Sequence, residues 1–392
     1  EGALLDFAAM TRINGLLLHG VAAYAGLRAS TCLSCASQTL RRELAPIFAT
    51  SDGLASIFPP GICIVGGKET DECGVDDDGV FVSVSRMTGE CGFFDVASEK
   101  WCRYPPMPTA RASCMTLCIG SMVYVLGGEA VDATGKEFAS PALERLDSEA
   151  QEWERLPSWP EPMFRAAAGY VGGHIVVAGG FERGASTDAA WDYSLRSRRW
   201  ARAPPMPTER SGCASATIGG KFYVVGGIDG DLDTTLDCLE VYEPGLGSAG
   251  RWTRLPPMPT ARERCVAVAV NAAAGSLLLV AGGMARSVLG CHCLMTDVVE
   301  CYDPCSAAWS ALPRLLRRRE APSAVAFDSK VLVFGGLAWW EESKWDVGDG
   351  GRAMALDLNR SMASSSPQGE GPAACSEGWS WGPRLPDSVV NL

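Results

Sequence analysis

The chain has 392 residues, of which 47% are hydrophobic and 20% are charged, a composition typical of globular proteins. A chain of this length holds either several domains or one large repeat architecture. Acidic residues outnumber basic ones by 46 to 34, and the net charge of -12 disfavours nucleic acid and anionic membranes as partners. No apolar run reaches the roughly 18 to 20 residues that a membrane span needs.

Residues 1–52 lack the repeat that fills the rest of the chain. Residues 36–48 have apolar side chains at helical spacing, so we expect a helical N-terminal extension. Residues 20–44 resemble the degenerate end of an F-box. The basic Arg12 and the apolar stretch after it resemble a signal segment. An F-box remnant, a signal segment and an extension packed on the neighbouring domain therefore remain as alternatives.

An apolar run that ends in a pair of glycines occurs six times after residue 52. The first glycines of these pairs are Gly66, Gly127, Gly179, Gly226, Gly282 and Gly335. Successive pairs lie 47 to 61 residues apart, and a strand-rich period near 50 residues indicates propeller blades rather than a helical solenoid. Two further pairs, Gly172-Gly173 and Gly219-Gly220, follow no apolar run and suit tight hairpin turns.

A tryptophan follows each glycine pair after a loop of variable length. These tryptophans are Trp101, Trp153, Trp200, Trp252, Trp309 and Trp381. A proline stands four residues after the tryptophan in five copies, whereas the proline after Trp381 is displaced by one residue. An arginine, in three copies preceded by P-M-P-T, opens the next unit. These arginines are Arg111, Arg165, Arg210, Arg262 and Arg319.

These residues resemble the kelch repeat, in which a glycine pair, a tryptophan and an opening arginine recur in each unit. The resemblance covers residues 53–392 and implies a four-stranded antiparallel blade per repeat, with the blades around a central axis. We therefore predict an all-β, six-bladed kelch β-propeller at residues 53–392, after the extension at residues 1–52. Residues 53–58 are the candidate first strand of blade one. We expect the tail, residues 388–392, to pair within blade one and close the ring.

The physical chemistry of the repeat agrees with this interpretation. Runs such as KFYVV are almost wholly apolar, as expected for strands packed on both faces. The glycine pair suits a strand end that needs positive φ and close backbone approach. Each tryptophan would fill the wedge between neighbouring blades and has one N–H to satisfy. Because neighbouring blades bury each other's faces, a single repeat is not expected to fold alone.

Sixteen cysteines are present, and several of them lie within apolar runs, where cysteine acts as a small hydrophobic residue. The clearest examples are Cys63, Cys118, Cys213 and Cys265. This placement predicts mostly free thiols in a reducing compartment, and hence a cytoplasmic location. A secreted, disulfide-bonded form is the alternative, since the number of cysteines does not exclude it.

Two cysteine groups have the composition of a metal site. Cys291-His292-Cys293, with Cys301 and Cys305, supplies zinc donors, but the spacing fits no known zinc finger. We interpret these cysteines as structural thiols. Cys32 and Cys35 form a single C-x-x-C without a second pair, which is a weak signal.

Asp229, Asp231 and Asp233, with Glu240 at the twelfth place, imitate a calcium-binding loop. Thr234 stands where such a loop needs glycine, and the flanking residues have strand character rather than helical character. We therefore predict no metal and no cofactor.

The sequence contains few of the motifs that indicate a catalytic site. Histidine occurs three times, so the copper site of kelch-type oxidases lacks its ligands. The acid-acid-histidine pattern of kelch-type iron proteins also fails, because Tyr170 and Ala166 stand at the acidic places before His174. Neither a G-x-S-x-G motif nor a phosphate-binding loop is present. We predict that the protein has no catalytic residues and is not an enzyme.

Two groups of residues are candidates for partner binding. The first group is the five arginines Arg111, Arg165, Arg210, Arg262 and Arg319, which recur once per blade. Their default role is structural, but as a ring they would attract acidic peptides. The second group is Trp339, Trp340 and Trp345, which lie within seven residues in the loop after the sixth glycine pair. Since Trp381 is the expected wedge of blade six, these three are surplus to the repeat.

The kelch resemblance implies a protein-interaction scaffold that binds its partner through loops at the propeller rim. A substrate receptor of a ubiquitin ligase and a cytoskeletal or signalling adaptor are the main candidates. The alternative is a kelch-type enzyme, such as a sugar-acid mutarotase that acts in the central pore. In both cases the loops determine specificity, because one fold supports many functions.

Overall fold

The structure is a computed structural model. It describes residues 61–70, 74–75, 81–82, 85–95, 100–182, 185–230, 234–245, 250–272, 275–286, 293–327, 329–336, 338–340, 344–346, 352–358 and 378–384. The chain divides into two compact units, residues 1–61 with 95–98 and residues 62–94 with 99–392. Apart from Gly61 and Asp95, the first unit lies outside the described residues, and so does the predicted N-terminal extension.

The described part of the second unit contains one three-stranded and five four-stranded antiparallel sheets, and each of these six corresponds to one repeat. In blades two to six the four strands lie side by side in chain order, from the innermost first strand to the outermost fourth strand. The strands of blade one are β1 Gly61–Thr70, β4 Ser85–Asp95 and β5 Lys100–Tyr104; of blade two, β6 Met115–Ile119, β7 Met122–Leu126, β10 Leu143–Asp147 and β11 Glu152–Leu156; of blade three, β12 Ala167–Val171, β13 His174–Ala178, β16 Ala190–Ser194 and β17 Arg199–Ala203.

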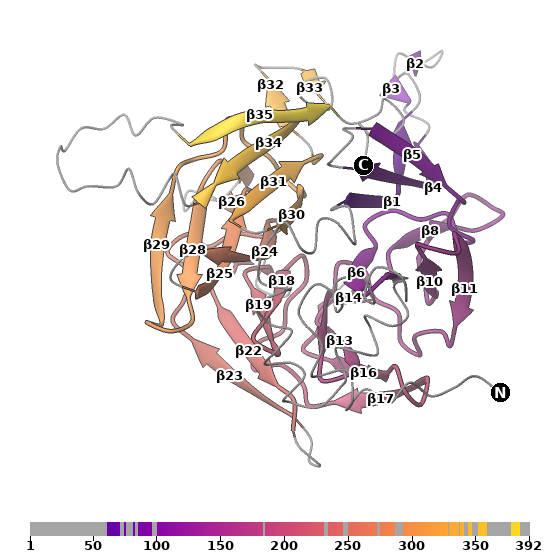
Figure 1. Cartoon of the computed structure of the whole chain (residues 1–392), viewed down its shortest axis with the longest axis horizontal. Coiled ribbons are helices and arrows are strands. Elements are labelled where there is room, and N and C mark those ends of the chain that lie inside the picture. Colours follow the sequence, from indigo (N-terminus) through magenta and orange to yellow (C-terminus); the bar gives the residue numbers. More distant parts are fainter. Residues whose placement is uncertain are drawn as a thin grey trace, which may run out of the picture. The chain divides into compact units, whose positions relative to one another are not determined.

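The remaining three blades repeat this order. Their strands are, in blade four, β18 Ala214–Ile218, β19 Lys221–Val225, β22 Leu239–Glu243 and β23 Arg251–Leu255; in blade five, β24 Val266–Ala272, β25 Gly275–Ala281, β28 Val299–Asp303 and β29 Ala308–Leu312; in blade six, β30 Ser323–Phe327, β31 Lys330–Phe334, β34 Arg352–Asp357 and β35 Trp379–Arg384. Neighbouring first strands contact each other from β6 through β12, β18 and β24 to β30, and Figure 1 shows the sheets following one another around a centre.

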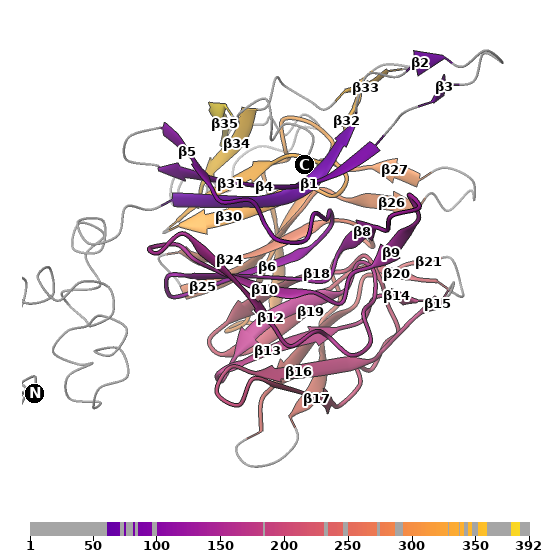
Figure 2. The same ribbon diagram turned by 90° about the vertical axis from the view of Figure 1, so that its right-hand side faces the viewer.

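A short two-stranded hairpin lies between the second and third strands of each blade, and in blades two to six it begins within two residues of the glycine pair. The six hairpins are β2 Gly74–Val75 with β3 Phe81–Val82, β8 Glu129–Val131 with β9 Glu137–Ala139, β14 Phe181–Glu182 with β15 Ala185–Ser186, β20 Ile228–Asp229 with β21 Thr234–Thr235, β26 Met284–Arg286 with β27 Cys293–Met295, and β32 Ala338–Trp340 with β33 Lys344–Asp346. Figure 2 shows all six on the same side of the sheets, which we call the hairpin face.

The second strand of each blade forms the centre of the core. Val125, Val177 and Val224 are fully buried, as the apolar runs predict for strands covered on both sides. One buried cluster joins Leu126 of blade two to Ile175 of blade three, so neighbouring blades share a core. This sharing supports the expectation that a single repeat does not fold alone.

The predicted hairpin turns are confirmed. Gly172 and Gly173 connect the paired residues Val171 and His174, with φ of +58° and +87°, and Gly219 and Gly220 make the same connection in blade four. Positive φ at both central positions is the requirement of a type I′ turn, which glycine meets without strain.

The predicted all-β, six-bladed propeller is confirmed by these sheets. The proposed first strand of blade one at residues 53–58 and the closing tail at residues 388–392 lie outside the described residues. Among the described strands of blade one, β1 is the innermost, so a strand added beside β1 would complete the four-stranded pattern.

Candidate functional site

The hairpin face is built by the glycine pairs. Gly127 and Gly128 have φ of +63° and +88°, and they turn the chain from β7 into the hairpin of blade two. A Cβ atom on Gly128 would lie 2.5 Å from the carbonyl oxygen of Ala112, so the close approach requires glycine. The reason for the approach is a backbone bridge between Ala112 and Glu129, which seats the hairpin on the segment that leads into its blade.

Exposed apolar side chains gather on these hairpins. Among the described residues, four large hydrophobic side chains are exposed: Val131 (39%), Phe138 (40%), Leu294 (55%) and Trp381 (41%). Val131 and Phe138 stand on the hairpin of blade two, and Leu294 stands on that of blade five. These three side chains make the hairpin face the candidate interaction surface of the described residues.

The three surplus tryptophans of the sequence lie in the hairpin of blade six. In the register of β32 and β33, Trp339 is paired with Trp345 and Trp340 is paired with Lys344. The structure therefore brings the three residues together within one hairpin of the hairpin face.

One residue in each segment that leads into a blade has a left-handed backbone. These residues are Ser113, Arg165, Gly212, Arg264 and Ala321, with φ between +48° and +59°. The amide of Gly212 donates to the carbonyl of Arg165, that of Arg264 to Gly212, and that of Ala321 to Arg264, over 2.7 to 3.0 Å. We call this chain of residues the inner belt. It joins consecutive blades three to six at the start of their innermost strands.

Two arginines of the inner belt differ in what they contact. The guanidinium of Arg264 forms an ion pair with Glu320 at the start of blade six. Arg165 is exposed, and no ion pair is found for it among the described residues. Arg165 is thus an exposed cation directly after Phe164, whose backbone bridge to Phe181 seats the hairpin of blade three.

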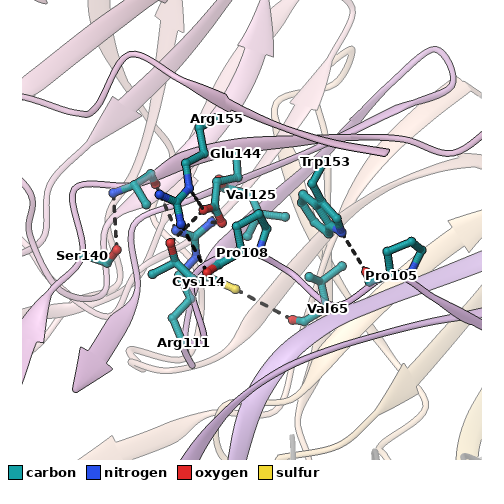
Figure 3. Close-up of polar contacts among 12 residues, drawn as sticks. Val65, Pro105, Pro108, Arg111, Cys114, Val125, Ser140, Glu144, Trp153 and Arg155 are labelled. Atoms are coloured by element: carbon teal, nitrogen blue, oxygen red, sulfur yellow. Dashed lines mark hydrogen bonds and ion pairs between the residues drawn. The ribbon is translucent and has the colours of Figure 1, made fainter. Parts of the chain in front are cut away.

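The other arginines of the predicted ring lie inside their blades. Arg111, Arg210, Arg262 and Arg319 are at most 1% exposed. The guanidinium of Arg210 lies 2.8 Å from Glu240, that of Arg262 2.6 Å from Glu300, and that of Arg111 3.1 Å from Glu144 (Figure 3). These contacts favour the structural role that the sequence left as the default.

The glutamate of each pair collects further partners. Glu144 accepts a hydrogen bond of 2.7 Å from Thr109 of the P-M-P-T sequence and lies 3.6 Å from Arg155 of the W-x-R sequence (Figure 3). Thr208 and Arg254 contact Glu240 in the same way. We call this arrangement the arginine–glutamate latch. It fastens the lead-in segment, the third strand and the fourth strand of a blade to one another.

Burial determines the electrostatics of the latch. Removal from water lowers the pKa of the Arg111 guanidinium, while the neighbouring Cys114 and Glu144 oppose the shift, and Arg262 behaves alike beside Cys265 and Glu300. A buried ion pair is stable only when hydrogen bonds also satisfy its remaining polar atoms. Arg262 meets this condition by donating to the carbonyl of Val298 over 2.7 Å.

The prediction that Arg165 is equivalent to Arg111 is wrong. The backbone amide of Trp159 bonds to Pro141 as that of Met107 bonds to Gly89, so Trp159 and Met107 are equivalent. The residue four positions later is Arg111 in blade two and Met163 in blade three. Met163 is buried, and the place of the latch glutamate is taken by Trp191, opposite Val177.

The assignment of Trp381 as the wedge of blade six is also wrong. In blades two to five, whose tryptophan side chains are described, the wedge tryptophan donates its indole N–H to a proline carbonyl of the preceding blade, as Trp153 does to Pro105 (Figure 3). The same bond, of 2.7 to 2.9 Å, is made by Trp200, Trp252, Trp309 and Trp379. Trp379 is 6% exposed, whereas Trp381 is 41% exposed, so Trp379 is the wedge.

The structure describes some of the residues that the sequence suggested as metal ligands. Cys301 lies buried in β28 with its thiol 3.0 Å from the hydroxyl of Ser310, and Cys305 is exposed. Glu240, the twelfth residue of the calcium-like pattern, belongs to the latch. The other residues named for these sites, Cys32, Cys35, Cys291, His292, Asp231 and Asp233, lie outside the described residues. Within the described ranges, no three His, Cys, Asp or Glu side chains are grouped as a metal site would need.

The described cysteines are free thiols. Burial raises the pKa of Cys213 to about 11 and also raises that of Cys265, so both are protonated thiols at neutral pH. In the part of the chain that is described, no helix is long and apolar enough to cross a membrane.

Comparison with known proteins identifies the class to which this geometry belongs. A family model described as the KLHDC2/KLHL20/DRC7 Kelch-repeats domain matches residues 114–336, which is more than half of the chain. The protein is therefore a member of the kelch-repeat β-propeller family.

The individual proteins and structures that match this chain share little sequence identity with it. Kelch-like protein 36 of Bos taurus is 21% identical over 71% of this chain, and the chain spans 42% of that protein. Alpha-scruin of Limulus polyphemus is 31% identical over 32% of this chain and 12% of its own length. The solved structure of YjhT has a TM-score of 0.58 at 15% identity, covers 69% of this chain and 89% of its own, and shows the shared fold.

Proposed function

We propose that this propeller is a non-enzymatic protein-interaction scaffold, and that the hairpin face is the surface that holds the partner. The observation that carries the proposal is the distribution of exposed apolar side chains. Three of the four large ones in the described residues stand on the rim hairpins. Burying such side chains against a partner would supply the main driving force for association.

Composition of the innermost strands supports a scaffold over an enzyme. The five described first strands read MTLCI, AAGYV, ASATI, VAVAVNA and SAVAF. Of the side-chain types that general acid–base catalysis uses, these strands contain Cys118 and Tyr170 but no Asp, Glu, His or Lys. A sugar-acid mutarotase acting in the pore would have to draw such groups from elsewhere.

The chemistry of the face suggests the kind of segment that it binds. Phe138 and Leu294 offer apolar contacts, Trp339, Trp340 and Trp345 supply the residue type most enriched at binding hot spots, and Arg165 supplies a cation. We propose as the partner an extended protein segment with apolar side chains and a carboxylate. A ubiquitin-ligase substrate receptor and a cytoskeletal or signalling adaptor could each bind such a segment, so both roles agree with the proposal. The free thiols support a cytoplasmic location.

The proposal is tested by affinity purification from cells with quantitative mass spectrometry. Phe138→Asp with Leu294→Asp places charge on two exposed hairpin positions and should remove a defined set of partners while the melting temperature stays unchanged. Glu149→Lys is the matched control, since Glu149 is exposed in the turn between β10 and β11, at the end of β10 away from the hairpin face.

Two results would contradict the proposal. One is a partner set that the hairpin substitutions leave intact. The other is a wild-type protein that binds no protein but binds a sugar acid in calorimetry, which would favour the enzyme instead.

A further inference from the structure

Two thiols meet in blade one. The Sγ atoms of Cys63 in β1 and Cys91 in β4 lie 3.9 Å apart, and β1 and β4 are hydrogen-bonded neighbours in one sheet. Other described cysteines have different partners, such as Val65 for Cys114 and Ser310 for Cys301. Within the described residues this is the one thiol–thiol hydrogen bond.

The surroundings of this pair are those of a packed interface. Cys91 is 1% exposed and Cys63 is partly exposed, and both belong to the cluster that joins blade one to Val123 and Val125 of blade two. In blade two, Tyr124 lies three residues before the glycine pair, as Cys63 does, and Leu143 lies ten residues before its tryptophan, as Cys91 lies before Trp101. Large side chains are thus replaced by two sulfur atoms in blade one.

We propose that Cys63 and Cys91 form a reversible intrachain disulfide when the protein meets a peroxide. The thiolate of Cys63, which is the more accessible, attacks a peroxide oxygen and becomes a sulfenic acid, and one water leaves. The sulfur of Cys91 then attacks the sulfur of that sulfenic acid, its proton leaves with the hydroxide, and a second water forms. Two thiols are oxidised and one peroxide is reduced to two waters.

The bond requires a local movement of the two strands. A disulfide needs the sulfur atoms at about 2.05 Å with the Cβ atoms about 3.5 to 4.5 Å apart. The equivalent residues of blade two stand diagonally in their ladder, because Tyr124 pairs with Arg145 and Leu143 pairs with Leu126. Side-chain rotation and a shift of the strands must therefore bring the Sγ atoms together from 3.9 Å. The sequence between the two cysteines contains the β2–β3 hairpin, so the disulfide would close a loop that includes the blade-one part of the hairpin face.

Electrostatics make the pair slow to react. The hydrogen bond with Cys91 and burial raise the pKa of Cys63, so the thiolate is scarce at neutral pH. Tyr104 of β5 and Cys118 of β6 are the other titratable groups that interact with Cys63, and neither brings a positive charge. We therefore expect the pair to stay reduced in a reducing compartment and to respond to sustained oxidation, faster as the pH rises.

The test is differential alkylation of the full chain. Protein is treated with hydrogen peroxide, free thiols are blocked with iodoacetamide in denaturant, and disulfides are then reduced and labelled with N-ethylmaleimide before peptide mapping. Cys63 and Cys91 should carry the second label together, and the unreduced digest should contain their cross-linked peptide two hydrogens lighter than the thiols. Dithiothreitol added before the alkylation step should abolish both signals.

Matched variants separate this pair from general oxidation. Cys91→Ser should abolish the cross-link and leave Cys63 to be trapped as a sulfenic acid by dimedone, while Cys118→Ser should retain the cross-link. The oxidised wild type should melt at a higher temperature than the reduced wild type, because a closed loop restricts the unfolded chain. A map in which Cys63 and Cys91 stay reduced while exposed cysteines oxidise, or in which Cys63 joins another cysteine, would overturn the proposal. The proposal does not depend on the proposed function.

Discussion

At the scale of single residues, the wedge tryptophans join neighbouring blades and the latches fasten blades two, four and five, and the blade that departs from this pattern is informative. In blade three, Met163 and Trp191 replace the latch arginine and glutamate together. Arg202 of the W-x-R sequence then lies over the Trp191 ring at 4.4 Å and pairs with Glu161 instead of a strand glutamate. An apolar pair of suitable volume can replace a buried ion pair at little cost in stability.

Removing one residue of a latch ion pair should cost more stability than replacing both residues with apolar ones. Glu240→Ala leaves the buried Arg210 without its carboxylate and should destabilise the protein by about 3 to 5 kcal/mol. Arg210→Met combined with Glu240→Met should recover most of that loss, because blade three already holds an apolar pair, Met163 and Trp191, at these two positions. Urea unfolding of the two variants measures the difference. Equal stability of the single and double variants would show that the pair is not coupled.

The wedge tryptophans give a prediction with an internal control. Trp252→Ala and Trp379→Ala each remove an indole that bonds to the preceding blade, and each should destabilise by about 3 to 5 kcal/mol. Trp381→Ala removes an exposed ring two residues away and should change the free energy of unfolding by less than about 1 kcal/mol. Chemical denaturation monitored by circular dichroism measures all three. A larger loss for Trp381→Ala than for Trp379→Ala would restore the assignment that the structure overturned.

At the scale of elements, the glycine pairs direct the chain into the rim hairpins. Gly128→Ala places a methyl group against the Ala112 carbonyl at a left-handed backbone position, and we expect a loss of about 2 to 4 kcal/mol. Gly135→Ala is the control, because Gly135 also has positive φ but a Cβ atom there meets nothing within 4 Å. Its cost should be about 1 to 2 kcal/mol. Thermal melts of the two variants decide whether close approach, rather than φ alone, selects glycine.

We predict that the tryptophans in the hairpin of blade six contribute to partner binding. Trp339→Ala with Trp340→Ala should leave the melting temperature unchanged and weaken partner capture by at least about 2 kcal/mol, since large rigid rings dominate binding energy. Titration of the purified partner against wild type and variant measures the loss. If the double variant unfolds and aggregates, the two rings belong to the core of the blade and do not bind the partner.

Sequence reasoning succeeded where a signal recurs in several copies. Glycine pairs and apolar second strands each appear six times, and together they predicted the number of blades and a loop after each pair. The errors arose in single copies. Both Trp379 and Trp381 follow the unusual stretch 361–375, and the proline four residues after Trp379, Pro383, was the signal that could have separated them.

The sequence alone also led to a wrong alignment of Arg165 with the repeat. It lies near the position that the repeat gives to an arginine, yet two residues separate it from the true equivalent, Met163. Only the backbone bond of Trp159 reveals the alignment, because P-M-P-T is absent from this copy. The latch glutamates were missed altogether, since their partners lie 30 to 38 residues away in sequence and no local spacing connects them.

At the scale of the whole molecule, a ring of blades offers a stable frame and leaves the hairpins free to vary. The inner belt and the shared cores make each blade depend on its neighbours, so specificity can change on the hairpin face without changing the frame. The central claim is that a protein partner is held on the hairpin face.

Hydrogen exchange of the complex, followed by mass spectrometry, tests that claim most directly. With the partner bound, amides of the hairpins β8–β9 and β26–β27 should exchange more slowly, while the turns Gly172-Gly173 and Gly219-Gly220 at the opposite ends of the strands should not change. Protection of those turns with unchanged exchange in the hairpins would contradict the account.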